Sequence, residues 1–327
     1  MKMRLTIALM LMFILVLMPS IIWLSLKQVH SPWWLENILS TPFIILVIYS
    51  VLMLALIKFI SFLHCVSYFI INFFLAILLN NTDSFNNTVT FSNKECTDPI
   101  TFFQFNIKYT EHKDEINELI EHLVAGKYHL ITLQGVSEQS KQRIIEKLNP
   151  YYPYFIRSEN SRQQVYSDQL LFSLYAFSKI RYYRYNDISY LVSSQWQSPF
   201  GDINLYTLHP PSPRNEKLWQ IRNKTLYQLK YAIESLSQKS SSMKSSIVIG
   251  DLNISKNSSR IKLLTQGMNT EFVNSWPKIG YVLPYFGLAI DHFFVSKAAT
   301  ICNRQRINQF SWSDHYAIKT RVYFKSR

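Results

Sequence analysis

The strongest constraint on the fold is the segment Leu5–Leu26, which is apolar and contains no charged residue. Lys2, Arg4 and Lys27 flank this segment. A helix of this length is long enough to cross the roughly 30 Å hydrocarbon core of a bilayer. A secretory signal peptide would be shorter and would end in small residues, whereas this segment ends in Ile, Trp and Leu. We therefore expect an uncleaved transmembrane helix.

A second apolar stretch, Thr41–Leu79, is about twice as long as one transmembrane helix requires. Lys58 divides it into 42–57 and 59–79, so we expect two further membrane-spanning helices and three in total. The alternative is one span followed by a re-entrant or interfacial helix. The intervening segment 27–40 contains two tryptophans and is predicted to be an interfacial loop. Residues 1–79 thus form a membrane region whose partner is the lipid bilayer.

The charge pattern of the short segments predicts the orientation. Residues 80–97 form a polar linker, and its first part, Asn80–Asn93, contains no Lys or Arg. Lys and Arg accumulate in cytoplasmic loops, so this linker is expected on the opposite side of the membrane. We predict a multi-pass protein of the cell (inner) membrane whose large domain is periplasmic or extracellular.

Residues 98–327 alternate between short apolar segments and amphipathic helices, a pattern typical of an α/β domain. One predicted helix places Ile116, Leu119, Ile120 and Leu123 on a single face, and another extends over 217–236. The predicted strands are 100–107, 128–133, 169–177, 188–192, 203–209, 246–251, 288–296 and 315–324.

Charge and cysteine content narrow the class of function. The chain of 327 residues has a net charge of +13, which favours anionic partners such as phosphates, nucleic acid or acidic lipid headgroups. Its three cysteines, Cys65, Cys96 and Cys302, have the spacing of neither a zinc site nor a redox pair. We expect Cys96 and Cys302 to be reduced core thiols, with a disulfide bond as the alternative.

Polar residues end several of the apolar strands, where a side chain is held rigidly at the rim of a core. Singly, each of them is a common turn or cap residue. Together they supply the oxygen ligands for a divalent cation and the groups that move protons at a phosphate ester. These residues are Asn106, His209, Asp251, Asn253, Asp291, Asp314 and His315.

The order of these motifs resembles the endonuclease/exonuclease/phosphatase superfamily, with its deoxyribonuclease-like fold. The motifs are Asn106, LQGV at 133–136, His209, GDLN at 250–253, DH at 291–292, and SDH at 313–315. The likeness covers 102–324 and is closest in style to membrane-anchored bacterial members. It implies two packed β-sheets flanked by helices, a four-layer α/β/β/α sandwich. Superfamily members hydrolyse nucleic acids, inositol phosphates or sphingomyelin.

The resemblance also implies roles at a metal site. Asn106 and Asp314 would bind Mg²⁺ (or Mn²⁺) directly or through water. Asp251 would position or deprotonate the attacking water, and Asn253 would hold a phosphate oxygen and the carboxylate.

Two histidines are implied to face the phosphate. His315 would contact the scissile phosphate, and Asp291 would bind its other ring nitrogen and fix the tautomer. His209 would be the second phosphate-facing histidine.

One position departs from the family pattern. The family places a metal-binding Glu after Leu-Gln, and here Gly135 follows Gln134. Glu138 is the nearest carboxylate and a candidate substitute, although an acidic residue there also suits a helix amino terminus.

Two functions follow from this pattern. The first is a membrane-anchored, divalent-metal-dependent phosphoesterase acting on nucleic acid, a phospholipid headgroup or a small phosphate ester, as a phosphodiesterase or a phosphomonoesterase. The second is a catalytically weak or inactive family member that binds an anionic ligand or a partner, with Gly135 as its main support.

Overall fold

The computed structural model describes most of the chain beyond residue 96 and scattered residues before it. The helices predicted for 5–26, 42–57 and 59–79 and the boundaries of the linker lie wholly or mostly outside the described residues. Within the part of the chain that is described, no helix combines the length and hydropathy that a bilayer crossing requires. The described residues are 25–26, 29, 31–41, 51, 66–67, 69–71, 73–74, 96, 98–157, 159–160, 165–239, 245–278 and 287–324.

The chain divides into two compact units, one of Met1–Asn86 with Ser255–Ile261 and the other of Asn87–Ile254 with Lys262–Arg327. The first unit contains α2 (Trp33–Leu39), a short helix in the segment predicted to be a loop. The helix forms because Leu39 is buried against apolar neighbours from the preceding residues and from α2 itself. The loop prediction was therefore wrong for this part of the chain.

The second unit contains a six-stranded mixed sheet in the spatial order β13-β14-β1-β2-β6-β3. Its central strand β1 pairs in parallel with β2 and antiparallel with β14. Residues of β1 and β2 are buried on both faces, which accounts for their nearly continuous apolar sequences. The strands are β1 (Ile100–Asn106), β2 (Leu130–Gln134), β3 (Tyr154–Ile156), β6 (Leu170–Ser173), β13 (Ala299–Ile307) and β14 (Ala317–Phe324).

The second sheet has the order β11-β12-β10-β9-β8-β5-β4, and β7 also pairs with β8. Strand β10 is parallel to β9 and antiparallel to β12. The strands are β4 (Glu159–Asn160), β5 (Val165–Tyr166), β7 (Phe177–Tyr185), β8 (Ile188–Ser198), β9 (Gly201–Leu208), β10 (Ser246–Asp251), β11 (Met268–Thr270) and β12 (Asp291–Ser296).

The two sheets pack face to face through a buried apolar layer. Phe102 of the first sheet contacts two aromatic residues of the second, with ring centroids 5.7 Å from Trp196 and 5.1 Å from Phe293. Both contacts are edge-to-face, the arrangement that aromatic pairs favour. The sandwich therefore has a core of its own between the sheets.

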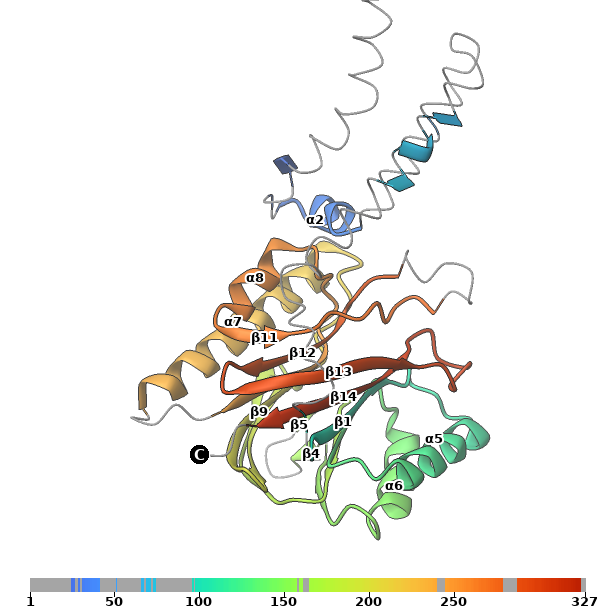
Figure 1. Ribbon diagram of the computed structural model, residues 1–327, viewed down its shortest axis with the longest axis vertical. Coiled ribbons are helices and arrows are strands. Elements are labelled where there is room, and N and C mark those ends of the chain that lie inside the picture. The colour runs from blue at the N-terminus through green and yellow to red at the C-terminus, as the bar shows by residue number, and fades with distance from the viewer. Residues whose placement is uncertain are drawn as a thin grey trace, which may run out of the picture. The chain divides into compact units, whose positions relative to one another are not determined.

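Helices cover the outer faces of the sandwich (Figure 1). On the first sheet lie α5 (Lys113–Gly126) and α6 (Glu138–Leu148), whose apolar residues join a second core cluster. The buried face of α5 is the predicted one, and Ser137 caps α6 by accepting from the Ser140 backbone N–H at 3.2 Å. On the second sheet lies α7 (Glu216–Lys239), where the Tyr206 hydroxyl donates to the Ala232 carbonyl.

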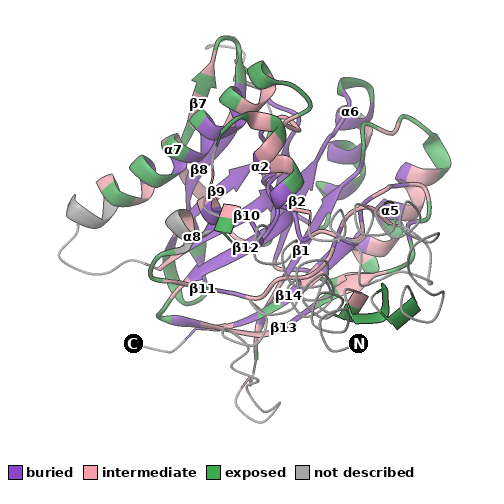
Figure 2. Ribbon diagram, turned by 90° about the horizontal axis from the view of Figure 1, so that it is seen from above, coloured by how far each residue is buried: buried purple, intermediate pink, exposed green. Residues whose placement is uncertain are grey.

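The architecture confirms the predicted fold of two packed sheets flanked by helices. Figure 2 shows the central strands buried and the outer faces of α5 and α7 exposed. The prediction missed β3, β4, β5, β7, β11 and β13. The longest of these, β7 and β13, have residues that are mostly exposed or half-buried. Because β13 is an edge strand and β7 pairs only with β8 among the described strands, neither shows the apolar sequence of a central strand.

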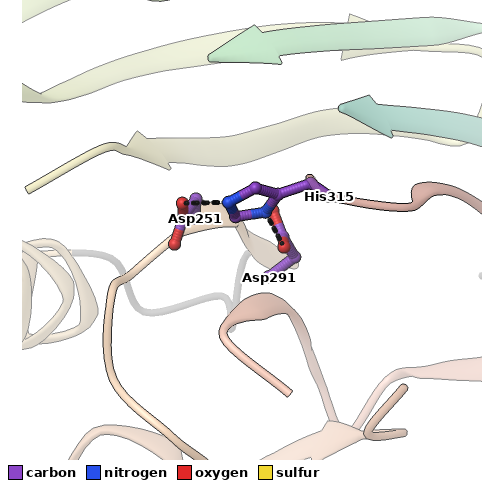
Figure 3. A group of neighbouring side chains, drawn as sticks. All are labelled: Asp251, Asp291 and His315. Carbon is purple, nitrogen blue, oxygen red and sulfur yellow. Dashed lines mark hydrogen bonds and ion pairs between the residues drawn. The ribbon is translucent and has the colours of Figure 1, made fainter. Parts of the chain in front are cut away.

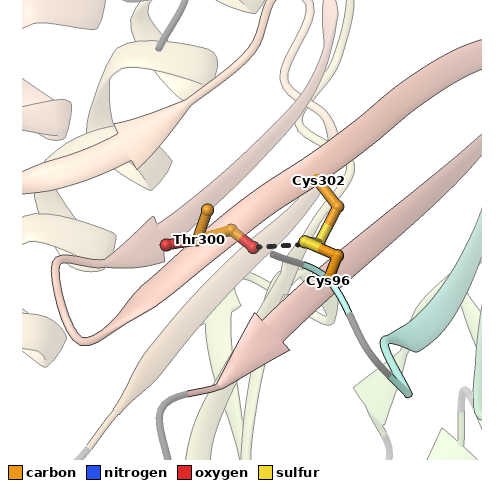
Figure 4. Close-up of a disulfide and its surroundings, with 3 residues drawn as sticks. All are labelled: Cys96, Thr300 and Cys302. Atoms are coloured by element: carbon orange, nitrogen blue, oxygen red, sulfur yellow. Dashed lines mark hydrogen bonds between the residues drawn. A yellow bond between two sulfur atoms is a disulfide. The ribbon is translucent and has the colours of Figure 1, made fainter. Parts of the chain in front are cut away.

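Cys96 and Cys302 form a disulfide bond (Figure 4). The bond ties the segment before β1 to β13, two parts of the chain 206 residues apart in sequence. The expectation of two reduced thiols was therefore wrong. Spacing alone cannot identify a pair brought together by sheet topology, here by the pairing of β13 and β1 with the same neighbour, β14.

Candidate active site

The polar strand ends meet at one edge of the sandwich. Strands β1 and β2 are parallel and end opposite each other, with Asn106 in register with Gln134. In the other sheet, Asp251 at the end of β10 is in register with Asp291 at the start of β12. His209 follows β9, and His315 precedes β14. The two sheets thus bring together residues that are more than 200 positions apart.

Asp251, Asp291 and His315 form a buried cluster (Figure 3). Nδ1 of His315 donates to Oδ2 of Asp291 at 2.8 Å, the contact predicted from the sequence. The other ring nitrogen, Nε2, lies 3.7 Å from Oδ2 of Asp251. Asp291 therefore orients the imidazole and directs its second nitrogen toward Asp251.

A second Asp–His pair faces Asp251 from the other side. Nδ1 of His209 donates to Oδ2 of Asp168 at 2.8 Å, and Nε2 of His209 lies 3.7 Å from Oδ2 of Asp251. The Tyr109 hydroxyl also donates to the Asp168 carboxylate. Asp251 is thus within ion-pair distance of two imidazoles, each held by its own carboxylate.

Asp168 was missed in the sequence. Asp168 precedes β6 and belongs to no short motif such as GDLN or SDH, so the local sequence does not single it out. Because β6 is antiparallel to β2, the start of β6 lies at the same edge of the sheet as the end of β2. Antiparallel pairing of these two strands was the signal that would have identified it.

Asn106 links the two sheets at this edge. Its Nδ2 donates to Oδ2 of Asp251 at 2.9 Å and lies 3.4 Å from Nε2 of His209. Its Oδ1 accepts from the Lys108 backbone N–H at 2.9 Å. The partners fix the amide orientation, because a flipped amide would turn its oxygen toward a carboxylate and its N–H groups toward an N–H donor.

Both histidines favour the charged form. Burial lowers the pKa of His209, but attraction by Asp168, the hydrogen bond to it and attraction by Asp251 outweigh burial and raise the pKa to about 9. The pKa of His315 is likewise raised to about 9, because Asp291 and Asp251 outweigh burial. Two imidazolium groups therefore flank Asp251 at neutral pH, a suitable environment for an anionic phosphate.

The pKa values of the three carboxylates, Asp251, Asp291 and Asp168, are shifted in different directions. Burial, followed by repulsion from Asp291, raises the pKa of Asp251, although both histidines act in the opposite direction. For Asp291, burial is outweighed by His315, Ser275 and Arg304, and the pKa is lowered. The pKa of Asp168 is also lowered, because attraction to His209 and its hydrogen bonds exceed the effect of burial. Of the three carboxylates, Asp251 therefore binds a proton most readily.

Asn253 lies beside this group, but its side chain does not make the predicted contact. Its backbone N–H donates to Oδ1 of Asp251 at 2.9 Å, whereas its Nδ2 donates to the Pro210 carbonyl at 2.9 Å. The backbone of Asn253 is left-handed, with φ of 49°. Its contact with the carboxylate is thus a main-chain contact.

Two of the three predicted metal ligands, Asp314 and Glu138, are paired with lysines. Oδ2 of Asp314 lies 3.4 Å from Nζ of Lys108 and accepts from Nε1 of Trp276 at 3.2 Å. Glu138 begins α6 and forms an ion pair of 2.6 Å with Lys141. Its role as a substitute ligand stays a prediction that competes with this pair.

Gly135 has a backbone that few other residues adopt. Its φ is +61°, in the left-handed region, and a Cβ placed on it would lie 2.6 Å from Oδ1 of Asn106. Such a contact requires the Asn106 side chain to move. A side chain at position 135 would therefore have to adopt an unfavourable left-handed backbone, and it would also displace the Asn106 amide.

The residues therefore fit a divalent cation at one position and not at another. Near Asn106 and Asp314, Gly135 replaces the metal-binding Glu of the family. The Asn106 side-chain oxygen already accepts a hydrogen bond, and Asp314 is paired with Lys108. In the buried cluster, Asp251, Asp291 and His315 offer three ligand atoms within 4.8 Å of one another. Two carboxylates and one imidazole form a donor set suited to a divalent ion.

The fold and site define the class of protein: a two-sheet α/β sandwich whose strand ends place an acidic residue between two Asp–His pairs. The chain belongs to the endonuclease/exonuclease/phosphatase family, whose model matches residues 103–315. Family members are hydrolases acting on phosphoesters and typically depend on divalent metal ions. No curated protein matches the chain.

Solved structures with the same fold support the architecture. A mutant of beta toxin from Staphylococcus aureus, with bound magnesium ions, matches with a TM-score of 0.53 and 13% identity, covering 70% of this chain and 100% of the toxin. Sphingomyelinase C from Streptomyces griseocarneus matches with a TM-score of 0.52 and 10% identity, covering 69% of this chain and 99% of the sphingomyelinase. An endonuclease/exonuclease/phosphatase family protein from Bacteroides thetaiotaomicron matches with a TM-score of 0.51 and 13% identity, covering 70% of this chain and 99% of that protein.

Proposed function

We propose that this protein is a phosphoesterase whose catalytic centre is Asp251 together with the Asp168–His209 and Asp291–His315 pairs. The observation that carries the proposal is the position of Asp251, whose Oδ2 lies 3.7 Å from Nε2 of both histidines. Two positive imidazoles around one carboxylate of raised pKa provide anion binding and proton acceptance at the same point.

Each group has a role in hydrolysis. Asp251 accepts a proton from water as the water oxygen bonds to phosphorus. The imidazolium groups of His209 and His315 stabilise the negative charge that develops on the phosphate. One of them donates a proton to the leaving oxygen as its bond to phosphorus breaks, and the Asn106 amide orients Asp251.

A divalent cation, Mg²⁺ or Mn²⁺, is part of the proposal. Asp251, Asp291 and His315 would hold it, and when bound it would neutralise charge on the phosphate. His315 would have to lose a proton to bind a metal, so the cation competes with protons at this residue. With the cation bound, His209 would be the imidazolium that stabilises the phosphate and protonates the leaving oxygen.

The substrate class that we propose is a phosphodiester or phosphomonoester of nucleic acid, of a phospholipid headgroup or of a small molecule. The excess of basic residues suits each of these anions. A second candidate function is ligand or partner binding by a catalytically weak member of the family. Gly135 favours it, because a family metal ligand is absent there.

We further propose that residues 1–79 anchor the protein in the cell (inner) membrane as a multi-pass region, followed by a linker over 80–97. The domain of 98–327 would then face the periplasm or the exterior. The charge pattern of 80–93 supports this orientation. The Cys96–Cys302 bond supports it independently, because disulfides persist in oxidising compartments.

Hydrolysis and ligand binding are distinguished by measuring turnover and affinity on the same preparation. The full chain in detergent is supplied with bis(4-nitrophenyl) phosphate or 4-nitrophenyl phosphate, with Mg²⁺, with Mn²⁺ or with EDTA. We expect multiple turnovers of at least one substrate with the metal ions and a marked loss in EDTA. Binding of inorganic phosphate without turnover of either ester under any of these conditions would support the second function instead.

A further inference from the structure

A lysine lies where the family pattern predicts a divalent cation. Lys108 lies two residues after Asn106, the last residue of β1, and beside Asp314 in space. Its ammonium group is 3.4 Å from Oδ2 of Asp314. Asn106 and Asp314 are the two predicted metal ligands that the sequence retains.

The backbone around Lys108 is built for this placement. The Thr110 backbone N–H donates to the Ile107 carbonyl at 3.1 Å, which closes a turn whose two central residues are Lys108 and Tyr109. Their φ values are 51° and 56°, a left-handed conformation that such turns usually assign to Asn or Gly. Side chains persist in this costly conformation where the surrounding structure holds them, and such strain is frequent at functional sites.

The turn fixes both flanks of the site. Tyr109 bonds through its backbone N–H to the Gly135 carbonyl at 2.6 Å and through its hydroxyl to Asp168. Lys108 bonds through its backbone N–H to Oδ1 of Asn106. The lysine is therefore anchored by its main chain while its side chain, 59% exposed, is free to reach solvent or a ligand.

The charges of Asp314 and Lys108 disfavour a divalent cation at the Asn106–Asp314 position. Asp314 carries one negative charge and Lys108 one positive charge, so the pair is neutral. A divalent cation that needs anionic oxygens gains little from a neutral pair and is repelled by the ammonium group. Gly135 cannot supply a carboxylate, and its left-handed backbone and the nearby Asn106 oxygen conflict with any side chain there.

We propose that the Lys108 ammonium replaces the divalent cation at the Asn106–Asp314 position and binds a phosphate oxygen of the substrate there. The proposal rests on the phosphoesterase function for its second part only. Lysine is a common phosphate ligand, acting as a point charge. The site would then combine one fixed positive charge from the chain with the cation of the Asp251 cluster.

Counting bound Mn²⁺ tests the first part without any measurement of activity. The full chain in detergent is titrated with Mn²⁺ and free ion is followed by electron paramagnetic resonance, for wild type, Lys108→Met and Lys108→Arg. We expect Lys108→Met to bind one more Mn²⁺ than wild type, because Asp314 is then no longer paired with a positive charge. Lys108→Arg keeps the charge and should bind as wild type does.

Two controls make the result specific. Asp314→Asn added to Lys108→Met should abolish the gained site, because it removes the only carboxylate that Lys108 pairs with in the described structure. Lys297→Met removes the same charge from the exposed turn at the far end of β12 and should bind like wild type. Equal Mn²⁺ binding by wild type and Lys108→Met would overturn the proposal, whether or not Asp314→Asn changes it.

Kinetics test the second part. Hydrolysis of bis(4-nitrophenyl) phosphate by Lys108→Met should show kcat/KM at least about tenfold below wild type, with Lys297→Met unchanged. A Lys108→Met enzyme as active as wild type would overturn phosphate binding by Lys108. If wild type hydrolyses no phosphoester, the proposed function fails, whereas the Mn²⁺ titration still decides whether Lys108 occupies the cation position.

Discussion

At the scale of single residues, the site depends on buried charges that are each paired. His209, Asp168 and Asp251 are all less than 10% exposed. A buried ion pair is expensive to form, and removal of one partner leaves the other charge uncompensated. The Asp168–His209 pair is therefore expected to be sensitive to both substitution and pH.

We predict that Asp168→Asn lowers the free energy of unfolding most at pH 5–6.5 and progressively less toward pH 10. The folded pKa of His209 is raised to about 9 from an ordinary value near 6.5, so its contribution is complete below about 6.5 and is lost as pH rises through about 9. The lowered pKa of Asp168 means that the contribution also declines in acid. Urea unfolding of the full chain, followed by tryptophan fluorescence at several pH values, measures this difference.

Asp187→Asn is the matched control for that series, because Asp187 is an exposed carboxylate in the turn between β7 and β8. Its substitution should leave the unfolding free energy nearly unchanged at every pH. A destabilisation by Asp168→Asn that does not vary between pH 6 and pH 10 would contradict the charged pair.

The residues that the sequence identified, and those that it missed, differ in one respect. Asp251 and His315 lie in short motifs at the ends of apolar strands, so the local sequence is enough to identify them. Asp168 and Lys108 act through partners at distant positions, His209 and Asp314, and neither has a motif of its own. Such residues become visible only when the strand pairing is known.

At the scale of elements, central strands were predictable and edge strands were not. The apolar sequences of β1 and β10 follow from burial on both faces. Strand β13 contains Arg304, Arg306 and Asn303 and reads as a polar loop. Strand β13 joins the sheet by pairing with β14, and the sequence of β13 alone has no alternating apolar pattern that would predict this pairing.

The disulfide is the strongest constraint on β13 that the structure adds. We predict that Cys96→Ala or Cys302→Ala lowers the free energy of unfolding by about 3–5 kcal/mol, because the bond closes a long loop in the unfolded chain. The double variant should be no less stable than either single variant, since one bond is lost in each case. Urea unfolding of the full chain provides the comparison.

Thiol alkylation followed by mass spectrometry checks the bond itself. Of the three cysteines, one should react before reduction and all three after it. Cys65→Ala serves as the control and should leave sensitivity to reductant unchanged. Three reactive thiols in the unreduced folded protein would contradict the pairing.

At the scale of the whole molecule, the proposed membrane region of residues 1–79 precedes a domain with a hydrolase fold. We predict that a reporter phosphatase active only outside the cytoplasm is active when fused after Asn93 and silent when fused after Lys58, because three spans place these points on opposite sides. Measuring both fusions with a second reporter that is active only in the cytoplasm gives the complementary pattern. Cytoplasmic activity at Asn93 would contradict the proposed orientation.

Asp251 is the proposed proton acceptor, and the rate of phosphodiester hydrolysis by Asp251→Asn measures that role. The full chain in detergent is assayed at pH 7 with the best substrate of the wild type, alongside Asp187→Asn as the charge-matched control. We predict a kcat at least about a hundredfold below wild type, since the variant cannot accept the proton of water, with the Cys96–Cys302 bond still formed. A kcat within about threefold of wild type would show that Asp251 is not the proton acceptor.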